Sequence, residues 1–410
     1  MTSPQLTALA AADDVFRRAG ARVVAALAAS LGARHLDLVE DAVQDALVSA
    51  MRSWAHGGVP DDPAAWLYRA SRNRALDLLR RDRGEASLDE HEGVHVDERW
   101  SEPHVHDAEL RMVLMCCHPR LSPTSRVALA LSVVAGLTAP EIARALVVAE
   151  PAARQLLVRA KRRLRDESVE LTLPGAADLD ERLDATLATI YLMFNEGYCA
   201  FDGERLVRRE LCREALRICG LLLDSPQTAR PRVLALAALL SFQSARLDAR
   251  TDADGNVIRL ADQDRSRYDA RLIGLGFELL GRAGEGSTLS IYHLEAEIAS
   301  HHARATSMAA TDWNAIVRAY DALVALNPSP VIALNRVVAI AERDGVNAAL
   351  ADLDALRGVP ALESYPFLHT TRGELLRRSG RVAESAAAFA HALALSISQP
   401  ARRFISARME

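Results

Sequence analysis

The chain has 410 residues, a net charge of -5 and five cysteines. Its length predicts two to four domains, and its scarcity of aromatic residues beside many Ala and Leu favours an all-α fold. The odd cysteine count, with Cys116 next to Cys117, argues against a disulfide framework and for reduced thiols. No apolar run approaches the roughly 20 residues of a membrane span, and acidic residues precede the first apolar run. We therefore expect a cytoplasmic protein with no membrane partner.

Residues 10–83 have the pattern of a helical domain. In Asp41–Trp54 the apolar residues recur at helical spacing, which leaves Asp41, Gln44 and Asp45 on another side. A Gly-containing loop at His56–Pro60 separates this helix from Pro63–Arg81. The second helix gathers four polar side chains on the face opposite Leu67: Arg69, Arg72, Asn73 and Arg80. Such a cluster favours an anionic partner, and a solvated face is the alternative.

Residues 84–109 break the helical pattern. They hold nine acidic residues and a single arginine, Arg99. A run of this composition cannot bury a core, so it is predicted to be a flexible acidic linker. Its negative charge would suit a basic channel that otherwise holds nucleic acid, and a plain spacer is the other interpretation.

Residues 110–168 are predicted to form a second helical domain that ends in a helix-turn-helix. Thr138 and Glu141 match a capping box, and Pro151 suits the first turn of the next helix. One side of that second helix is apolar, and the other carries Arg154, Gln155, Val158, Arg159 and Arg162. Arg and Gln can make bidentate bonds to base edges, and a valine can contact a thymine methyl. The pattern indicates a DNA-reading helix, with a solvated basic face as the alternative.

Residues 175–410 are predicted to be a helical-repeat domain. Pro330, Pro366 and Pro400 are 36 and 34 residues apart, and Gly345 and Gly380 are 35 apart. A period near 34 residues with two helices per unit is that of a tetratricopeptide-like α-solenoid, whose stacked hairpins form a concave groove.

The remaining motif searches argue against a metal site and against an enzyme active site. The Cys116-Cys117-His118 cluster lacks a second group of ligands, so a buried helix end is expected and no metal. No phosphate-binding Gly loop, zinc-binding motif or nucleophile elbow is present. We therefore expect neither a cofactor nor an enzyme.

Taken together, the segments resemble a known family. DAVQDALVSAMRSW, PAAWLYRASRNRALDLLRR and LTAPEIARALVVAEPAARQLLVRAKRRLR occur in the order and spacing of group IV, or extracytoplasmic-function type, bacterial RNA polymerase sigma factors. The rest resembles the subfamily with a C-terminal tetratricopeptide-like helical extension. Four segments carry that second likeness: FNEGY at 194–198, DQDRSRYD at 262–269, TDWNAIVRAYD at 311–321 and SPVIALNR at 329–336.

The resemblance implies a role for each surface. Asp41, Gln44 and Asp45 would bind the clamp helices of core RNA polymerase, and the loop at 54–60 would hold a flipped base of promoter DNA. The basic face of the 63–81 helix would hold the melted strand, since captured bases and phosphate contacts offset the cost of unstacking. The 154–162 face would read the upstream promoter element, and the acidic linker would follow the RNA exit path.

The resemblance leads to a sigma factor that directs promoter recognition, melting and transcription initiation. Its repeat domain would act as a built-in regulator, and the groove would suit a protein or peptide ligand. Two other classes stay open: a repeat scaffold with a vestigial DNA-binding half, and a helix-turn-helix activator that binds duplex DNA without polymerase.

Overall fold

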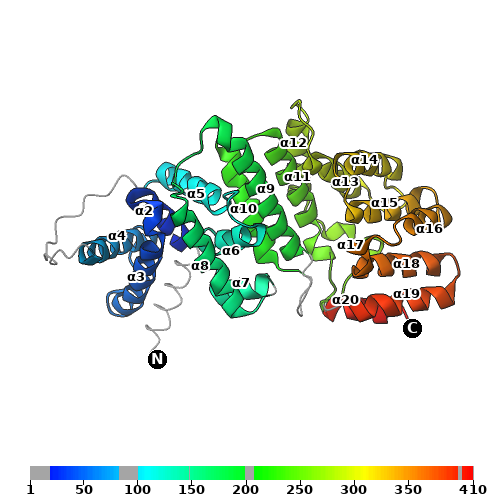
Figure 1. The fold of residues 1–410 in the computed structure, drawn as a ribbon, viewed down its shortest axis with the longest axis horizontal. Helices are drawn as coiled ribbons and strands as arrows, with labels where there is room; N and C mark the ends of the chain where they lie inside the picture. Colours follow the sequence, from blue (N-terminus) through cyan, green and yellow to red (C-terminus); the bar gives the residue numbers. More distant parts are fainter. Residues whose placement is uncertain (1–18, 83–99, 147, 199–206, 396–398, 410) are drawn as a thin grey trace. The chain divides into compact units, whose positions relative to one another are not determined.

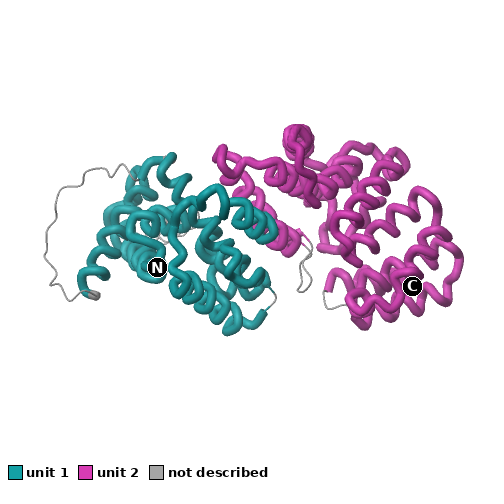
Figure 2. The backbone as a smooth tube through the Cα atoms, turned by 45° about the horizontal axis from the view of Figure 1, so that its top comes forward, with its two compact units in different colours: residues 1–190 teal, residues 191–410 magenta. Residues whose placement is uncertain are grey.

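The computed structural model describes residues 19–82, 100–146, 148–198, 207–395 and 399–409, in which helices joined by short loops are the regular secondary structure, and this confirms the all-α prediction (Figure 1). Within these ranges the β-structure consists of one isolated antiparallel bridge between Thr251 and Val257. None of the described helices combines the length and the apolar character needed to cross a membrane. Contacts divide the chain into two compact units, residues 1–190 and 191–410, with the boundary inside α9 (Figure 2).

Unit 1 contains two groups of helices. The first group is α2 (Ala21–Leu31), α3 (Leu36–Gly57) and α4 (Pro63–Asp82), and the second is α5 (Glu102–Cys116), α6 (Pro123–Val133), α7 (Ala139–Ala145) and α8 (Glu150–Asp166). The first part of α9 (Ala176–Tyr198) completes the unit. Helix α3 packs along α4, and α8 packs on α6 and α7.

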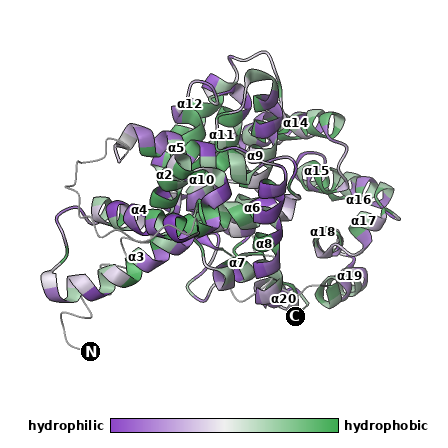
Figure 3. Ribbon diagram, turned by 60° about the vertical axis from the view of Figure 1, so that its left-hand side comes forward, coloured by the Kyte–Doolittle hydropathy of each residue, from purple (hydrophilic) through white to green (hydrophobic). Residues whose placement is uncertain are grey.

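Unit 2 contains the second part of α9 and a series of helices in which neighbours along the chain pack on one another. They are α10 (Arg209–Asp224), α11 (Pro231–Ala245), α12 (Ala270–Ala283), α13 (Ile291–Arg304), α14 (Trp313–Leu326), α15 (Pro330–Arg343), α16 (Val346–Ala355), α17 (Pro360–Glu363), α18 (Pro366–Arg378), α19 (Val382–Leu395) and α20 (Gln399–Ser406). Helix α11 is apolar on nearly every side and is coloured accordingly in Figure 3. It contacts α10, α12 and α13, which is why it has no polar face.

The predicted hairpin turns lie at the expected glycines. Gly345 and Gly380 have φ values of +94° and +80°, a region that non-glycine residues rarely adopt. The prolines of this spacing begin helices: Pro330 starts α15 and Pro366 starts α18. The first helical turn leaves its N–H groups unpaired in any case, so proline costs nothing there.

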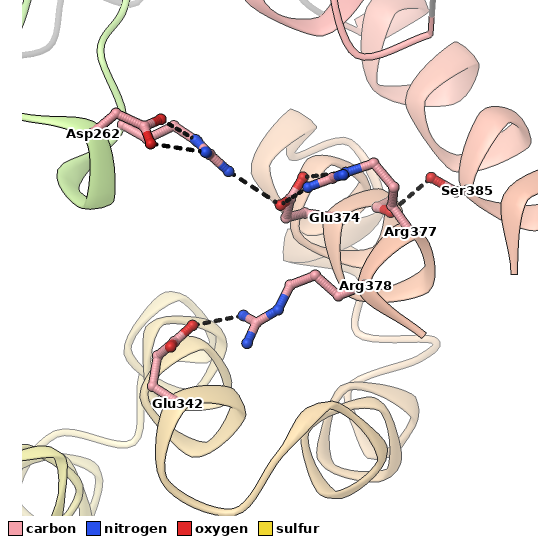
Figure 4. A network of polar contacts seen from close by, with 8 residues as sticks. Asp262, Glu342, Glu374, Arg377, Arg378 and Ser385 are labelled. Atoms are coloured by element: carbon pink, nitrogen blue, oxygen red, sulfur yellow. Dashed lines mark hydrogen bonds and ion pairs between the residues drawn. The ribbon is translucent and has the colours of Figure 1, made fainter. Parts of the chain in front are cut away.

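Side-chain bonds connect different helices of unit 2, both adjacent ones and ones further apart in the chain (Figure 4). Arg378 of α18 contacts Glu342 of α15 at 2.6 Å, and Ser385 of α19 donates to the backbone oxygen of Gly373 in α18 at 2.8 Å. A Cβ on Gly373 would meet the ring of Phe389 at 2.9 Å, so the glycine is what lets α18 and α19 approach this closely. The hairpins are therefore joined by polar contacts as well as by their apolar faces.

Two predicted boundaries need correction. The irregular linker was expected to continue to Glu109, but α5 begins at Glu102, with Ser101 at its N-cap and Val105 and Ala108 buried. The many acidic residues in this segment suggested an irregular chain. The segment is nevertheless helical, because packing of its apolar side stabilises the helix. The loop expected from His56 begins later, because α3 continues to Gly57. The rest of the predicted linker, residues 84–99, lies outside the described residues.

Candidate nucleic-acid and polymerase interface

The local sequence around 137–151 forms the two helices that were predicted. The carboxylate of Glu141 accepts hydrogen bonds from the backbone N–H of Thr138 at 2.7 Å and from its hydroxyl at 2.6 Å, so α7 begins at the predicted cap. Pro151 lies in the first turn of α8. Ala153, Ala160 and Leu164 are buried and turn one side of α8 toward the domain core.

The opposite side of α8 faces solvent. Its five predicted contact residues are all exposed: Arg154, Gln155, Val158, Arg159 and Arg162. Val158 is 65% exposed and gives this otherwise polar surface an apolar contact point. The structure thus places together every residue that the sequence assigned to this face.

The cations of this surface have weak internal partners. Arg154 pairs with Glu150 at 2.5 Å and Arg162 with Asp166 at 3.5 Å, each one turn away on the same helix. Exposed pairs of this kind contribute about 0.3–0.5 kcal/mol. Among the described residues Arg159 has no ion-pair partner. A phosphate or a base edge can therefore displace these contacts at little cost.

The acidic surface lies on α3 in the same unit. Asp41, Gln44 and Asp45 are exposed, while Ala42 and Val43 between them are buried. Asp45 also accepts a hydrogen bond from Arg74 of α4 at 2.7 Å, a contact that sequence periodicity did not reveal. These three side chains form one polar edge on the solvent side of α3.

The basic residues of α4 occupy one side of that helix. Asn73 and Arg80 are exposed, and Arg69 and Arg72 are half-buried. Arg80 approaches Asp77 only to 3.9 Å. The core side of the helix holds Ser71, which is buried as predicted, together with Tyr68 and Ala75.

The loop between α3 and α4 is shorter than predicted. Trp54 is 5% exposed and its ring meets Trp66 edge-on at 5.3 Å between centroids. Gly58, with φ of +81°, ends the helix. Trp54 is therefore part of the core and cannot itself receive a flipped base, so the loop proper is limited to the residues after Gly57.

Lys161, the only lysine of the chain, lies on α8 and contacts Glu40 and Asp37 near the start of α3. Its Nζ is 3.0 Å from the Asp37 carboxylate. Burial alone would lower the pKa of Lys161, but the two carboxylates raise it above its ordinary value. This contact joins residues 121 positions apart, and no local pattern indicated it.

The cysteines of unit 1 are buried as predicted. Cys116 and Cys117 end α5, and burial raises the pKa of the Cys117 thiol to about 11. Burial together with nearby arginines lowers the pKa of His118 to about 4. No cluster of metal-ligand side chains occurs among the residues that the structure describes.

Comparisons with known proteins also divide the chain into separate helical domains. Residues 16–85 match the family described as sigma-70 region 2, residues 111–164 match sigma-70 region 4, and residues 182–284 match a family of unknown function, DUF6596. These domains define a sigma factor of the extracytoplasmic-function type, which binds core RNA polymerase and promoter DNA to initiate transcription.

A relative covers nearly the whole chain. An uncharacterized protein of Rhizobium meliloti (strain 1021) is 40% identical over 385 residues, which is 92% of this chain and 90% of that protein. The chain belongs to the same family as this protein, with its sigma-70 regions in the N-terminal half. No solved structure matches it.

Proposed function

We propose that the exposed face of α8 reads the upstream promoter element from the major groove. The observation that carries this proposal is the exposure of Arg154, Gln155, Val158, Arg159 and Arg162 on one side of a helix whose other side is buried. The residues combine bidentate donors with one methyl-bearing side chain, which is the chemistry of direct readout. Their internal ion pairs are too weak to compete with DNA.

The other two surfaces have separate roles in the proposal. Arg69, Arg72, Asn73 and Arg80 of α4 hold the backbone of the melted strand, and Asp41, Gln44 and Asp45 of α3 bind the clamp helices of core polymerase. The opposite charges support this division, because a basic side suits phosphates while an acidic edge is repelled by them. The protein acts by binding and contributes no catalytic residue. The proposal keeps 10–83 as the first sigma domain, starts the second sigma domain at Glu102 with α5, and assigns residues 191–410 to the regulatory unit.

The polymerase contact can be tested with neutral isosteres. The double substitution Asp41→Asn with Asp45→Asn is expected to weaken binding to core polymerase by about tenfold or more, because charge pairs at interfaces are worth a few kcal/mol. The measurement is a fluorescence titration of labelled full-length chain with core enzyme. Asp178→Asn, an exposed acid on α9, is the matched control.

Two results would favour another class of protein. Unchanged core binding by the double variant supports the scaffold alternative, since a scaffold does not need this edge. Tight, sequence-specific binding of the free chain to duplex DNA supports the stand-alone activator. Salt dependence is expected in every case and does not separate them.

We further propose that unit 2 regulates the sigma domains. The support is its size and its independent core, which includes Leu323, Leu334 and Leu353, in a chain whose sigma-70 matches end at residue 164. A truncation to test this must end after Ile190, because Leu183 and Leu187 of α9 are buried in unit 1. The expected result is a changed promoter output with core binding retained. Retained core binding with unchanged output would contradict regulation.

A further inference from the structure

A small pocket of about 180 Å³ opens within unit 2. Five helices supply its walls: α9, α11, α13, α14 and α15. The remainder of its lining is apolar, and its polar or hydroxyl-bearing lining residues are Tyr191, Asn195, Tyr198, Gln243, Glu295, Tyr320 and Asn335. The volume suits a compact chemical group and is below that of pockets for drug-sized ligands.

Three of the four segments that carry the likeness to the sigma subfamily meet at this pocket. Asn195 belongs to FNEGY, Tyr320 to TDWNAIVRAYD and Asn335 to SPVIALNR. Asn195 and Asn335 are exposed at the mouth of the pocket, and the side chain of Asn195 hydrogen-bonds to Tyr191. The fourth segment has a structural role instead, since the Tyr268 hydroxyl donates to Gln263 at 3.0 Å. The convergence of three separate segments on one cavity indicates a shared task.

The carboxyl of Glu295 lacks a counter-ion. In the described part of the chain no arginine, lysine or histidine pairs with it, and its hydrogen-bond partner is the Tyr191 hydroxyl. Burial raises the pKa of Glu295 to about 7. Glu196, also in this unit, has by contrast an ion pair with Arg208 at 2.8 Å. A partly buried carboxylate costs free energy unless a cation accompanies it, so the pocket is incomplete as it stands.

The walls also suit a cation. Two tyrosine rings, Tyr191 and Tyr320, flank the carboxyl, and aromatic faces attract ammonium and guanidinium groups. The side-chain oxygens of Gln243 and of the two asparagines can accept the N–H groups of such a ligand. A neighbouring contact uses the same chemistry: the guanidinium of Arg250 lies 3.5 Å from the ring centroid of Tyr198. No cationic side chain lines the pocket, so an anionic ligand would find no counter-ion there and would lie close to the Glu295 carboxyl.

We propose that this pocket binds an organic cation, an alkylammonium or alkylguanidinium group, with Glu295 as its counter-ion. The group can belong to a free small amine or to a lysine or arginine side chain of a peptide. Binding of this kind goes beyond the proposed regulation and does not depend on it, because it is a property of the free chain.

The test uses full-length protein and isothermal titration calorimetry at pH 8. The probes are n-butylguanidine, its neutral isostere n-butylurea, and the blocked tripeptide acetyl-Gly-Arg-Gly amide. At least one cationic probe is expected to bind, while n-butylurea is not. Glu295→Gln should weaken cation binding at least tenfold, and Glu297→Gln, an exposed acid on the same helix, should leave it unchanged.

The relative affinities of the probes identify the source of the cation or overturn the proposal. Tighter binding of the tripeptide than of n-butylguanidine assigns the cation to a polypeptide, and the reverse order assigns it to a free amine. The proposal is overturned if neither cation binds, if n-butylurea binds equally well, or if folded Glu295→Gln protein binds like wild type. A thermal melt of each variant establishes that it is folded.

Affinity should also rise between pH 5.5 and pH 8, because the cation needs the carboxylate form of Glu295. The other titratable groups that face the carboxyl are tyrosines, Tyr191 and Tyr198 from α9 and Tyr320 from α14. Burial raises the pKa of Tyr191 and of Tyr320 above its ordinary value, so they do not titrate in this range. Helices α11 and α15 contribute the neutral amides of Gln243 and Asn335. A flat pH profile would contradict the role of Glu295.

Discussion

Arg162 of α8 and Arg336 of unit 2 are used in opposite ways. On α8, Arg162 is 76% exposed and its partner Asp166 lies on the same helix at 3.5 Å. In unit 2, Arg336 is 29% exposed and joins two other helices, through Asp321 of α14 at 2.6 Å and Asp352 of α16 at 2.8 Å. A cation whose partners come from other helices stabilises the fold, whereas one with only a local partner remains available to an external anion.

The largest expected effect tests the α8 side of this comparison. Replacing Arg154, Arg159 and Arg162 together by alanine should reduce promoter-dependent transcription by reconstituted holoenzyme at least about 100-fold, since each base or phosphate contact is worth roughly 1–3 kcal/mol. The free energy of unfolding should change little. Arg163→Ala is the control, because that exposed arginine lies outside the proposed reading face. Equal loss in the control would mean that bulk charge, and not this face, matters.

A smaller effect is expected at Lys161, a largely buried cation of α8 whose partners Glu40 and Asp37 lie on α3. Lys161→Ala leaves the half-buried Glu40 without its cation and should lower the free energy of unfolding by about 1–3 kcal/mol in urea titrations. Arg165→Ala is the matched control, since Arg165 is 53% exposed and reaches Asp37 only at 3.6 Å. A similar cost for both variants would show that burial does not distinguish the two contacts.

For unit 2 the comparison predicts a modest loss of stability. Arg336→Ala should cost about 1 kcal/mol, because a partly exposed pair of ion pairs exceeds the value of a single surface pair only slightly. Arg357→Ala, with 65% exposure and one local partner, should stay within about 0.5 kcal/mol of wild type. Both variants are measured by thermal unfolding at low salt, where such pairs are least screened. If the two variants lose the same stability, then an arginine that joins two other helices stabilises the fold no more than one with a local partner.

The smallest effect depends on pH. Because the folded state raises the pKa of Glu295 to about 7, its protonated form stabilises the fold below the ordinary value of 4.5, and this contribution is lost as pH rises through 7. Glu295→Gln resembles the protonated form, so it should raise Tm at pH 8 and leave it unchanged at pH 4.5. An increase of equal size at both pH values would point to packing instead of charge.

Local patterns predicted the helices well and the helix ends less well. The Thr138–Glu141 cap and the buried side of α8 follow from spacings of three and four residues, so the sequence alone revealed them. The start of α5 at Glu102 was missed, because acidic composition concealed a helix whose apolar side is stabilised by packing. The length of α3 was also underestimated, because the ring of Trp54 packs edge-on against Trp66 of α4, and this tertiary contact cannot be seen in the local sequence.

The sequence by itself determined the helical class and the exposed, arginine-rich face of α8. Each of these depends on residues within one or two turns, where backbone geometry fixes which side chains share a face. Only the tertiary structure decided that Lys161 binds Glu40, that Arg336 joins α14 to α16, and that Glu295 meets Tyr191 and Asn335 in one pocket. Such contacts depend on how helix faces pack against one another, and sequence spacing does not encode the partner across a packed interface.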